Sequence, residues 1–281
     1  MQSRPLSIPL PRHGSGAHSR GSLPPPGKGE HMLLKDKVII VTGATSGIGA
    51  ATAVEAAQQG AKVVLAGRRA DKGEELVGRI RANGGTALFV RTDVSQEADI
   101  EALIARTLRE YGRLDGAFNN AGIPGPIGKL ADLPPAEYRQ LMSINLDATF
   151  LSMRYEIQAM KKNGGGSIVN CASILSHVAA SGFGAYVSAK HGLMGMTKAA
   201  ALDYATERIR VNSVLPGPID TEIWSHIEQG EPTRQAFVAG VPMQRSARSE
   251  EVAKPVLFLL SDWSTYITGT ALVIDGGYSA Q

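Results

Sequence analysis

The sequence predicts an α/β fold, a doubly wound parallel sheet of about seven strands with helices on both faces. Short apolar, β-branched runs alternate with longer helical stretches along the chain, which is typical of parallel strands joined by helices. The right-handed rule for such crossovers favours a doubly wound strand order. With 281 residues the chain can bury one substantial core, and the alternation indicates no second domain.

The expected strands are apolar runs, each bounded by glycine, polar or helical segments. The stretches Ala50–Gln59 and Tyr138–Lys161 read as helices between them. The runs predicted as strands are Val38–Val41, Val63–Ala66, Ala87–Val90, Leu114–Phe118, Ile168–Cys171, Val211–Val214 and Ala271–Ile274.

Residues 1–31 differ in composition from the rest of the chain. They are rich in Pro, Ser, Gly and Arg, contain no acidic residue before Glu30, and show no helical periodicity. Such a segment is not expected to fold on its own. We predict a disordered tail or an extension left by cloning or gene prediction, with Met32 as the natural start. Targeting is the alternative, although the segment lacks a signal-peptide core and its prolines oppose a transit helix.

A glycine-rich loop follows the first predicted strand. Thr42-Gly43, Gly47 and Gly49 lie between that strand and the helical run that starts at Ala50. Glycines allow the backbone to approach a pyrophosphate, and the following helix N-terminus presents unpaired N–H groups. A turn with positive φ explains one glycine but not all three. The strand–loop–helix context therefore predicts a Rossmann-type dinucleotide site.

The end of the second predicted strand bears on the choice of cofactor. An NAD site usually has an acidic residue here, which binds the ribose 2′-hydroxyl. This chain has Gly67-Arg68-Arg69 instead. Guanidinium groups suit a 2′-phosphate, so the sequence favours NADP(H) over NAD(H). Ordinary surface arginines are the alternative.

Tyr186 and Lys190 form the strongest catalytic candidate. They are four residues apart and share one face if the segment is helical. An ammonium group near a phenol stabilises the phenolate, so Lys190 is expected to lower the tyrosine pKa from its usual value of about 10. Tyr186 would then act as a general acid and base. The pair alone is common by chance, and the glycine loop upstream gives it weight.

From about Leu34 to Tyr278 the chain resembles the short-chain dehydrogenase/reductase family, in particular its compact single-domain members. The glycine loop, Tyr186 to Lys190 and the turn Asn119-Asn120-Ala121-Gly122 carry the resemblance. It implies that residues 32–281 form a single dinucleotide-binding catalytic domain, with a substrate lid at about 218–248. It also implies a homotetramer.

The resemblance assigns roles to individual residues. Ser173 would hydrogen-bond the substrate oxygen and Tyr186 would be the general acid/base. Lys190 would bind the nicotinamide ribose and lower the tyrosine pKa, and Asn145 would hold a water in the proton relay. The implied cofactor-binding residues are Gly43, Ser46, Gly47, Ile48, Gly49, Arg68, Arg69, Asp93, Val94, Asn120, Ala121, Gly122, Tyr186, Lys190, Pro216, Gly217, Ile219 and Thr221.

Composition excludes several other classes of protein. Outside residues 1–31 the formal net charge is zero, which gives no electrostatic basis for binding nucleic acid. No stretch approaches a membrane span. No histidines or cysteines have metal-ligand spacing, so no metal is expected. The single cysteine, Cys171, lies on a predicted core strand and favours a cytoplasmic location.

The predicted function is an NADP(H)-dependent oxidoreductase, a carbonyl reductase or alcohol dehydrogenase that moves a hydride between the nicotinamide and a ketone or secondary alcohol. The expected pocket walls are apolar or small, which favours a neutral or hydrophobic substrate. One alternative is a 3-oxoacyl-[acyl-carrier-protein] reductase, for which Arg154, Lys161 and Lys162 are the candidate docking residues. The other is a catalytically silent, nucleotide-sensing scaffold.

Overall fold

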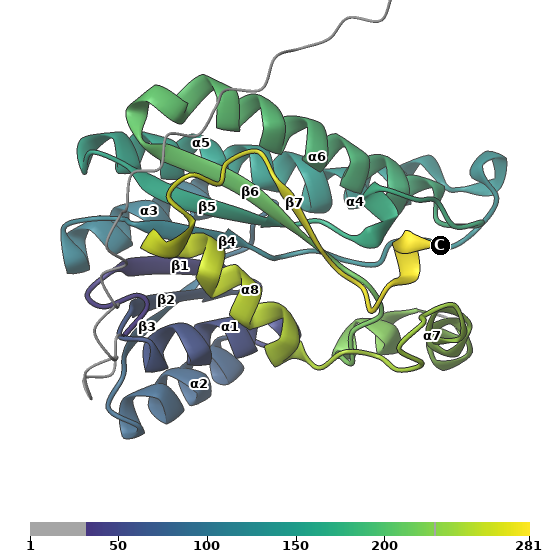
Figure 1. Cartoon of the computed structure of the whole chain (residues 1–281), viewed down its shortest axis with the longest axis horizontal. Coiled ribbons are helices and arrows are strands. Elements are labelled where there is room, and N and C mark those ends of the chain that lie inside the picture. The colour runs from purple at the N-terminus through teal and green to yellow at the C-terminus, as the bar shows by residue number, and fades with distance from the viewer. Residues whose placement is uncertain (1–31, 228) are drawn as a thin grey trace, which may run out of the picture. The chain divides into compact units, whose positions relative to one another are not determined.

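Seven parallel strands form the centre of the molecule in the computed structural model, which describes residues 32–227 and 229–281 (Figure 1). The tail predicted at residues 1–31 lies outside the described residues. The strand order is β3-β2-β1-β4-β5-β6-β7, which confirms the predicted doubly wound sheet. The strands are β1 (Val38–Thr42), β2 (Lys62–Gly67), β3 (Thr86–Arg91), β4 (Gly116–Asn119), β5 (Gly166–Cys171), β6 (Ile209–Pro216) and β7 (Ala271–Ile274).

Helices cover both faces of the sheet (Figure 1). One face carries α1 (Gly47–Gln58), α2 (Ala70–Ala82) and α8 (Ser249–Leu260). The other carries α3 (Glu97–Tyr111), α5 (Ala148–Lys162) and α6 (Gly184–Tyr204), with α4 (Pro135–Met142) beside α6. The helix α7 (Gly230–Ala239) lies in the predicted lid, away from both layers.

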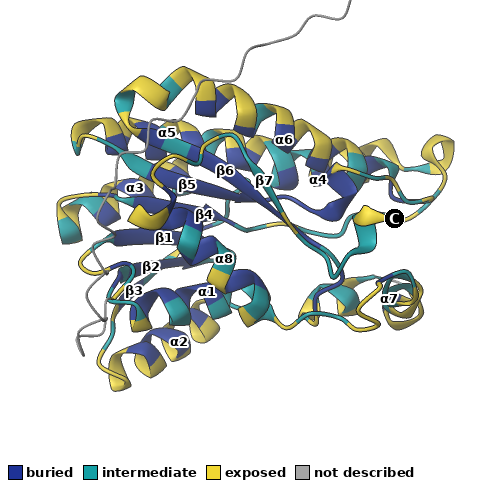
Figure 2. Ribbon diagram, in the orientation of Figure 1, coloured by how far each residue is buried: buried dark blue, intermediate teal, exposed yellow. Residues whose placement is uncertain are grey.

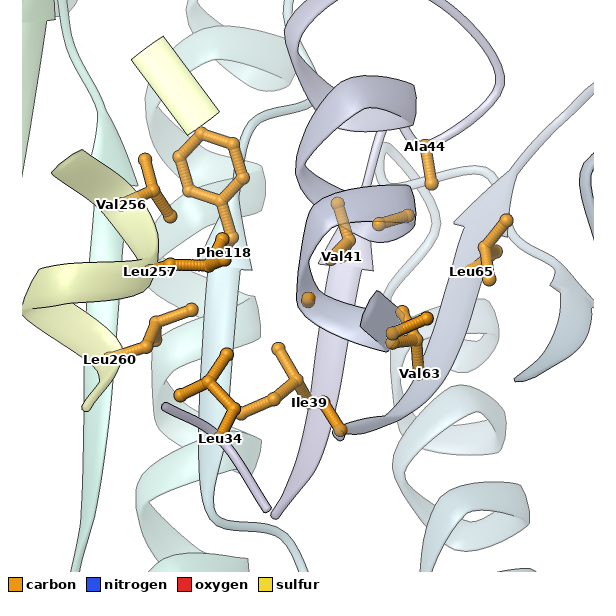
Figure 3. Packing of buried hydrophobic residues seen from close by; sticks show 14 of the residues in the cluster. Leu34, Ile39, Val41, Ala44, Val63, Leu65, Phe118, Val256, Leu257 and Leu260 are labelled. Carbon is orange, nitrogen blue, oxygen red and sulfur yellow. The ribbon is translucent and has the colours of Figure 1, made fainter. Parts of the chain in front are cut away.

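The sheet is buried on both faces, which explains its unbroken apolar runs. Ile39 and Val41 of β1 point into a cluster under α1 and α8, where Phe118 and Leu260 join them (Figure 3). Ile40, between them in sequence, points into the opposite cluster. This alternation follows from the two-residue period of a strand. The central strands β1, β4, β5 and β6 are buried along almost their whole length, whereas the edge strands β3 and β7 are partly exposed (Figure 2).

The strand order brings two predicted site segments together. The chain runs outward from β1 to β3 and then returns to place β4 on the other side of β1. The glycine loop follows β1 and the turn follows β4, and these two strands are neighbours. From β1 the chain winds toward β3 at one edge of the sheet, and from β4 it winds toward β7 at the other. Ligands of open α/β sheets bind at such a switch point, outside the carboxyl ends of the strands.

The stretch Tyr138–Lys161, predicted as one helix, is interrupted. A π-helical turn at Ser143–Asp147 joins α4 to α5. Within it, the Asn145 amide nitrogen donates to the Ile123 carbonyl at 2.8 Å, and its oxygen accepts from the Ile123 N–H at 2.8 Å. The hydrophobic period of a helix carries no signal for such a turn, and π turns often occur at functional sites.

Candidate active site

A cleft of about 1080 Å³ opens at the carboxyl edge of the sheet. Its volume is slightly above the range of about 300–1000 Å³ usual for small-molecule sites. Its walls come from segments that follow β1, β2, β3, β4 and β6. The predicted cofactor residues that line it are Gly43, Ser46, Gly47, Ile48, Arg68, Arg69, Asp93, Val94, Asn120, Ala121, Gly122 and Thr221.

The glycine loop has the geometry of a phosphate cradle. Gly43 and Gly47 have φ values of 64° and 52°, in the region that side chains disfavour. Gly49 lines neither cavity, but a Cβ there would collide with the Gly43 carbonyl oxygen. The first N–H groups of α1 have no intrahelical partner, and they lie at the positive end of the helix dipole. These features fit a dinucleotide pyrophosphate.

The turn after β4 is fastened to the glycine loop. The Thr42 hydroxyl accepts from the backbone N–H of Asn120 at 3.0 Å and of Ala121 at 3.2 Å. The Asn120 amide donates to the carbonyls of Thr42 at 3.1 Å and Gly43 at 3.3 Å. The two segments therefore position each other. Thr42 belongs to the glycine motif, but the sequence alone indicates no role for its hydroxyl.

The ends of β2 and β3 form the far wall of the cleft. The Asp93 carboxylate accepts from the Ser95 hydroxyl at 2.8 Å, and this bond lowers the Asp93 pKa. Arg68 is exposed, and in the described part of the chain its guanidinium has no hydrogen bond or ion pair. Arg69, in contrast, donates to the Ser46 hydroxyl at 2.7 Å and to Glu222 at 3.1 Å.

A smaller cavity of about 160 Å³ adjoins the cleft and contains the catalytic candidates. Ser173 follows β5, while Tyr186 and Lys190 lie on α6, and all three line this cavity. Asn120, Gly122 and Thr221 line both cavities, so the two form a continuous site. The predicted cofactor-binding residues Pro216, Gly217 and Ile219 also line the smaller cavity.

The Tyr186–Lys190 pair has the expected proximity but not the expected effect on the tyrosine. The Lys190 Nζ lies 5.5 Å from the centre of the Tyr186 ring and donates to the Cys171 carbonyl at 2.8 Å. Burial raises the Tyr186 pKa above its usual value, and Ser173 opposes the shift. The direction of this shift is opposite to the predicted lowering, because burial has the largest effect on the phenol.

Two other predicted site residues, Ser173 and Asn145, make hydrogen bonds that the sequence did not predict. Ser173 caps a short 3₁₀ turn, where its hydroxyl accepts from the Leu175 N–H at 3.1 Å. Asn145 is 1% exposed, lines neither cavity, and holds the backbone of Ile123 beside the Asn120–Gly122 turn. Its predicted role in holding a relay water stays a prediction.

The predicted lid covers the smaller cavity with aromatic residues. Phe237 on α7 lies 5.6 Å from Phe183, 6.1 Å from Trp224 and 6.2 Å from Tyr278, between ring centres. The Trp224 indole N–H donates to the Ile219 carbonyl at 2.8 Å, a bond within the lid that fixes Trp224 to the residues where the lid begins. The substrate side of the site is therefore largely apolar.

A buried polar network lies beneath the turn after β4, and sequence reasoning missed it. The Asn119 amide nitrogen donates to Glu156 on α5 at 3.0 Å and to Asn170 on β5 at 3.1 Å. Glu156 is 1% exposed, and burial raises its pKa to about 7. The Asn119 amide oxygen has no hydrogen-bond partner among the described residues.

Residues 32–227 and 229–281 contain no cluster of His, Cys, Asp or Glu that could hold a metal ion. Among these residues, no helix combines the length and the apolar character that crossing a membrane requires.

Residues 43–279 match a family model described as enoyl-(acyl carrier protein) reductase. The chain is 40% identical over 248 residues to a cyclohexanol dehydrogenase of Acinetobacter sp. (strain SE19), covering 88% of this chain and 97% of the relative. It is 41% identical over 249 residues to a 2,5-dichloro-2,5-cyclohexadiene-1,4-diol dehydrogenase of Sphingobium indicum, covering 88% and 98%. The crystal structure of a levodione reductase superimposes with a TM-score of 0.84 at 35% identity, over 88% of this chain and 99% of that one.

Proposed function

The chain belongs to the short-chain dehydrogenase/reductase family, and on that premise we propose that it oxidises a six-membered cyclic secondary alcohol, or reduces the ketone, with NADP(H). That it is an oxidoreductase follows from the family and from its relatives, which are dehydrogenases acting on alcohols. The cofactor choice, the ring-shaped substrate and the residue roles are the proposal.

One observation supports the proposal most. Ser173, Tyr186 and Lys190 line a cavity that is continuous with the dinucleotide cleft through Asn120, Gly122 and Thr221. A cofactor whose phosphates lay on the glycine loop would thus have its reactive ring beside the tyrosine. When bound, the nicotinamide supplies or accepts the hydride.

The protein's residues would handle the proton and the charge. In reduction, negative charge develops on the carbonyl oxygen, and the hydroxyls of Ser173 and Tyr186 would donate hydrogen bonds to it. Tyr186 would then deliver its proton to that oxygen. The phenol is protonated at neutral pH even at its ordinary pKa of about 10, and burial raises that pKa further; a protonated phenol suits this direction. Lys190 has three N–H donors, and one is taken by the Cys171 carbonyl.

The two arginines after β2 support NADP(H). Both line the cleft, and neither Gly67 nor its neighbours supply the acid that usually binds a 2′-hydroxyl. Arg68 would contact the 2′-phosphate from the exposed side of the cleft. Arg68→Ala should then weaken NADPH binding about tenfold while NADH changes less than about twofold. Equal losses for the two cofactors would argue against this role.

The substrate class is inferred from the small cavity and the relatives. The cavity, of about 160 Å³, is walled by apolar residues that include Leu175, Phe183 and Ile223. Two relatives are named for six-membered ring alcohols. We propose cyclohexanol- and cyclohexanone-like compounds without a charged substituent. The 3-oxoacyl-[acyl-carrier-protein] alternative is not favoured, since Lys161 of its candidate docking patch pairs with Glu207 at 2.9 Å.

The experiment that tests this function measures cofactor turnover with a panel of cyclic and open-chain alcohols and ketones, using wild type, Tyr186→Phe and Tyr204→Phe. Tyr204 is the control, because it lies at the far end of α6. Loss of the phenol proton should lower kcat about 10³-fold with NADPH affinity nearly unchanged. Alcohol oxidation should also accelerate as the pH rises, because it needs the phenolate.

Near-full activity of Tyr186→Phe would contradict the assigned mechanism. Tight NADPH binding without turnover on any panel member would favour the nucleotide-sensing alternative. We also propose, from the family, that the enzyme is a cytoplasmic homotetramer. Light scattering of the purified protein tests the tetramer, and a monomer at micromolar concentration would contradict it.

A further inference from the structure

A carboxylate from the lid reaches the wall of the cleft that carries the two arginines proposed to distinguish NADP(H) from NAD(H). Glu222 begins the 3₁₀ turn Glu222–His226 in the lid. Its Oε2 lies 3.1 Å from the Arg69 Nη1, although the two residues are 153 positions apart. Both side chains line the dinucleotide cleft.

Arg69 is held on three sides. Its Nε and Nη2 donate to the Thr45 hydroxyl at 3.2 and 3.1 Å, and its Nη2 donates to the Ser46 hydroxyl at 2.7 Å. The remaining nitrogen, Nη1, donates to Glu222. The guanidinium therefore lies across the glycine loop. The Glu222 carboxylate occupies Nη1, the one nitrogen that would otherwise be available to an anion.

The pKa of Glu222 in turn depends on its contact with Arg69. The hydrogen bond from Arg69 is the largest of the influences that lower the Glu222 pKa, and Ser46 and His226 act in the same direction. The carboxylate is therefore ionised at neutral pH. An anion entering beside Arg69 would meet both a cation that is already paired and a negative charge at close range.

We propose that Glu222 determines cofactor selectivity by competing with the 2′-phosphate for Arg69. The inference rests on the proposed use of a nicotinamide dinucleotide. With Glu222 in place, Arg69 is partly neutralised and Arg68 is the cation left for the phosphate. The protein accordingly discriminates less sharply in favour of NADP(H) than its two arginines suggest.

The same contact links the cofactor wall to the lid. Thr221, the residue before Glu222, lies against the glycine loop, since a Cβ on Gly47 would meet its Cγ2 at 3.1 Å. Trp224, in the same 3₁₀ turn, packs beside Phe237 over the substrate cavity. A 2′-phosphate that took Arg69 would release Glu222 from the cleft wall and change how this turn is held.

The test compares two adenosine ligands that differ only in the 2′-phosphate, 2′,5′-ADP and 5′-AMP, by calorimetry on the full chain. In Glu222→Gln, affinity for 2′,5′-ADP relative to 5′-AMP should rise about two- to fivefold, the range measured for partly exposed ion pairs. The control is Glu231→Gln, a lid carboxylate that pairs with Arg234 at 2.7 Å instead, and its ratio should equal that of wild type.

A double-variant cycle separates competition from a general change of charge. In an Arg69→Met background, Glu222→Gln should change the ratio less than about 1.5-fold. An unchanged or lowered ratio in Glu222→Gln alone would overturn the proposal, because Glu222 would then be neutral or would orient Arg69 for the phosphate. If wild type binds 2′,5′-ADP but Glu222→Gln has no effect, only this inference fails. If wild type binds neither nucleotide, the proposed function fails with it.

Discussion

The cofactor half and the lid half of the site are built in different ways. The cofactor half consists of short segments that follow β1, β2, β3 and β4, each fixed by a strand that is buried on both faces. The lid half, from Pro218 to Arg248, contributes no strand to the sheet among its described residues, 218–227 and 229–248. It is held by aromatic packing and a few polar contacts.

This difference in construction indicates where substrate specificity can change without loss of the fold. In the cofactor half, the glycine loop and the turn after β4 contact each other through their backbones. A substitution in either segment therefore disturbs both. In the lid half, Phe237 packs against the aromatic rings of Phe183 and Trp224. Chemistry and cofactor binding are therefore expected to be intolerant of substitution, and substrate choice tolerant.

The largest effect on cofactor affinity is expected from Gly49→Ala. The added methyl group would meet the Gly43 carbonyl and the Asn120 Nδ2, the latter at 2.7 Å, and would push the cofactor segments apart. Overpacking of this kind costs about 1–3 kcal/mol, so NADPH affinity should fall up to about a hundredfold. Titration of cofactor fluorescence measures this.

Gly78→Ala is the matched control for that experiment. Gly78 lies on α2, and a Cβ there would have nothing within 4 Å. This variant should bind NADPH like wild type and be slightly more stable, since alanine favours a helix by about 1 kcal/mol over glycine. Equal affinity of the Gly49→Ala variant and wild type would show that the cradle is not the binding site.

The next effect concerns the support beneath the cofactor half. Burial raises the Glu156 pKa from 4.5 to about 7 in the folded protein. The folded state therefore keeps a proton that the unfolded chain loses, and stability falls as the pH rises from about 4.5 to about 7. At 1.36 kcal/mol per pKa unit the loss is about 3 kcal/mol.

Urea unfolding of wild type and Glu156→Gln at a series of pH values measures this. The variant keeps an oxygen acceptor for Asn119 and has no proton to lose. Its free energy of unfolding should therefore increase relative to that of wild type as the pH rises across that window. Glu101→Gln, an exposed residue of α3, should show no such trend. Parallel curves for wild type and Glu156→Gln would mean that Glu156 does not titrate there.

The smallest effect is expected in the lid half. Phe237→Ala removes ring contacts with Phe183, Trp224 and Tyr278, each worth about 0.5–1.5 kcal/mol. We expect KM for a cyclohexanone-like substrate to rise about tenfold, with NADPH affinity within about twofold. Phe150→Ala, on the exposed side of α5 at 50% exposure, is the control. A comparable loss of NADPH affinity in Phe237→Ala would break the distinction between the two halves.

The sequence predicted the part of the molecule that depends on local signals. The run before Thr42, the glycines after it and the spacing of Tyr186 and Lys190 are local, and each strand was found where its apolar run lies. What failed depends on distant neighbours. The Tyr186 pKa reflects burial, the interruption at Asn145 reflects its bonds to Ile123, and no local pattern brings Glu222 to Arg69.

The parallel sheet also leaves one whole edge of the molecule outside the chemistry. The turns that lead into strands lie at the amino edge, opposite the cleft. Gly84, Gly112 and Gly164 precede β3, β4 and β5 there, and, apart from the glycine itself and its two chain neighbours, no atom of the described residues lies within 4 Å of a Cβ added to any of the three. A surface tether or a fluorescent dye attached beside these turns would hold the enzyme with its cleft facing outward. This edge is therefore the natural side for immobilising the protein in a reactor or on a sensor.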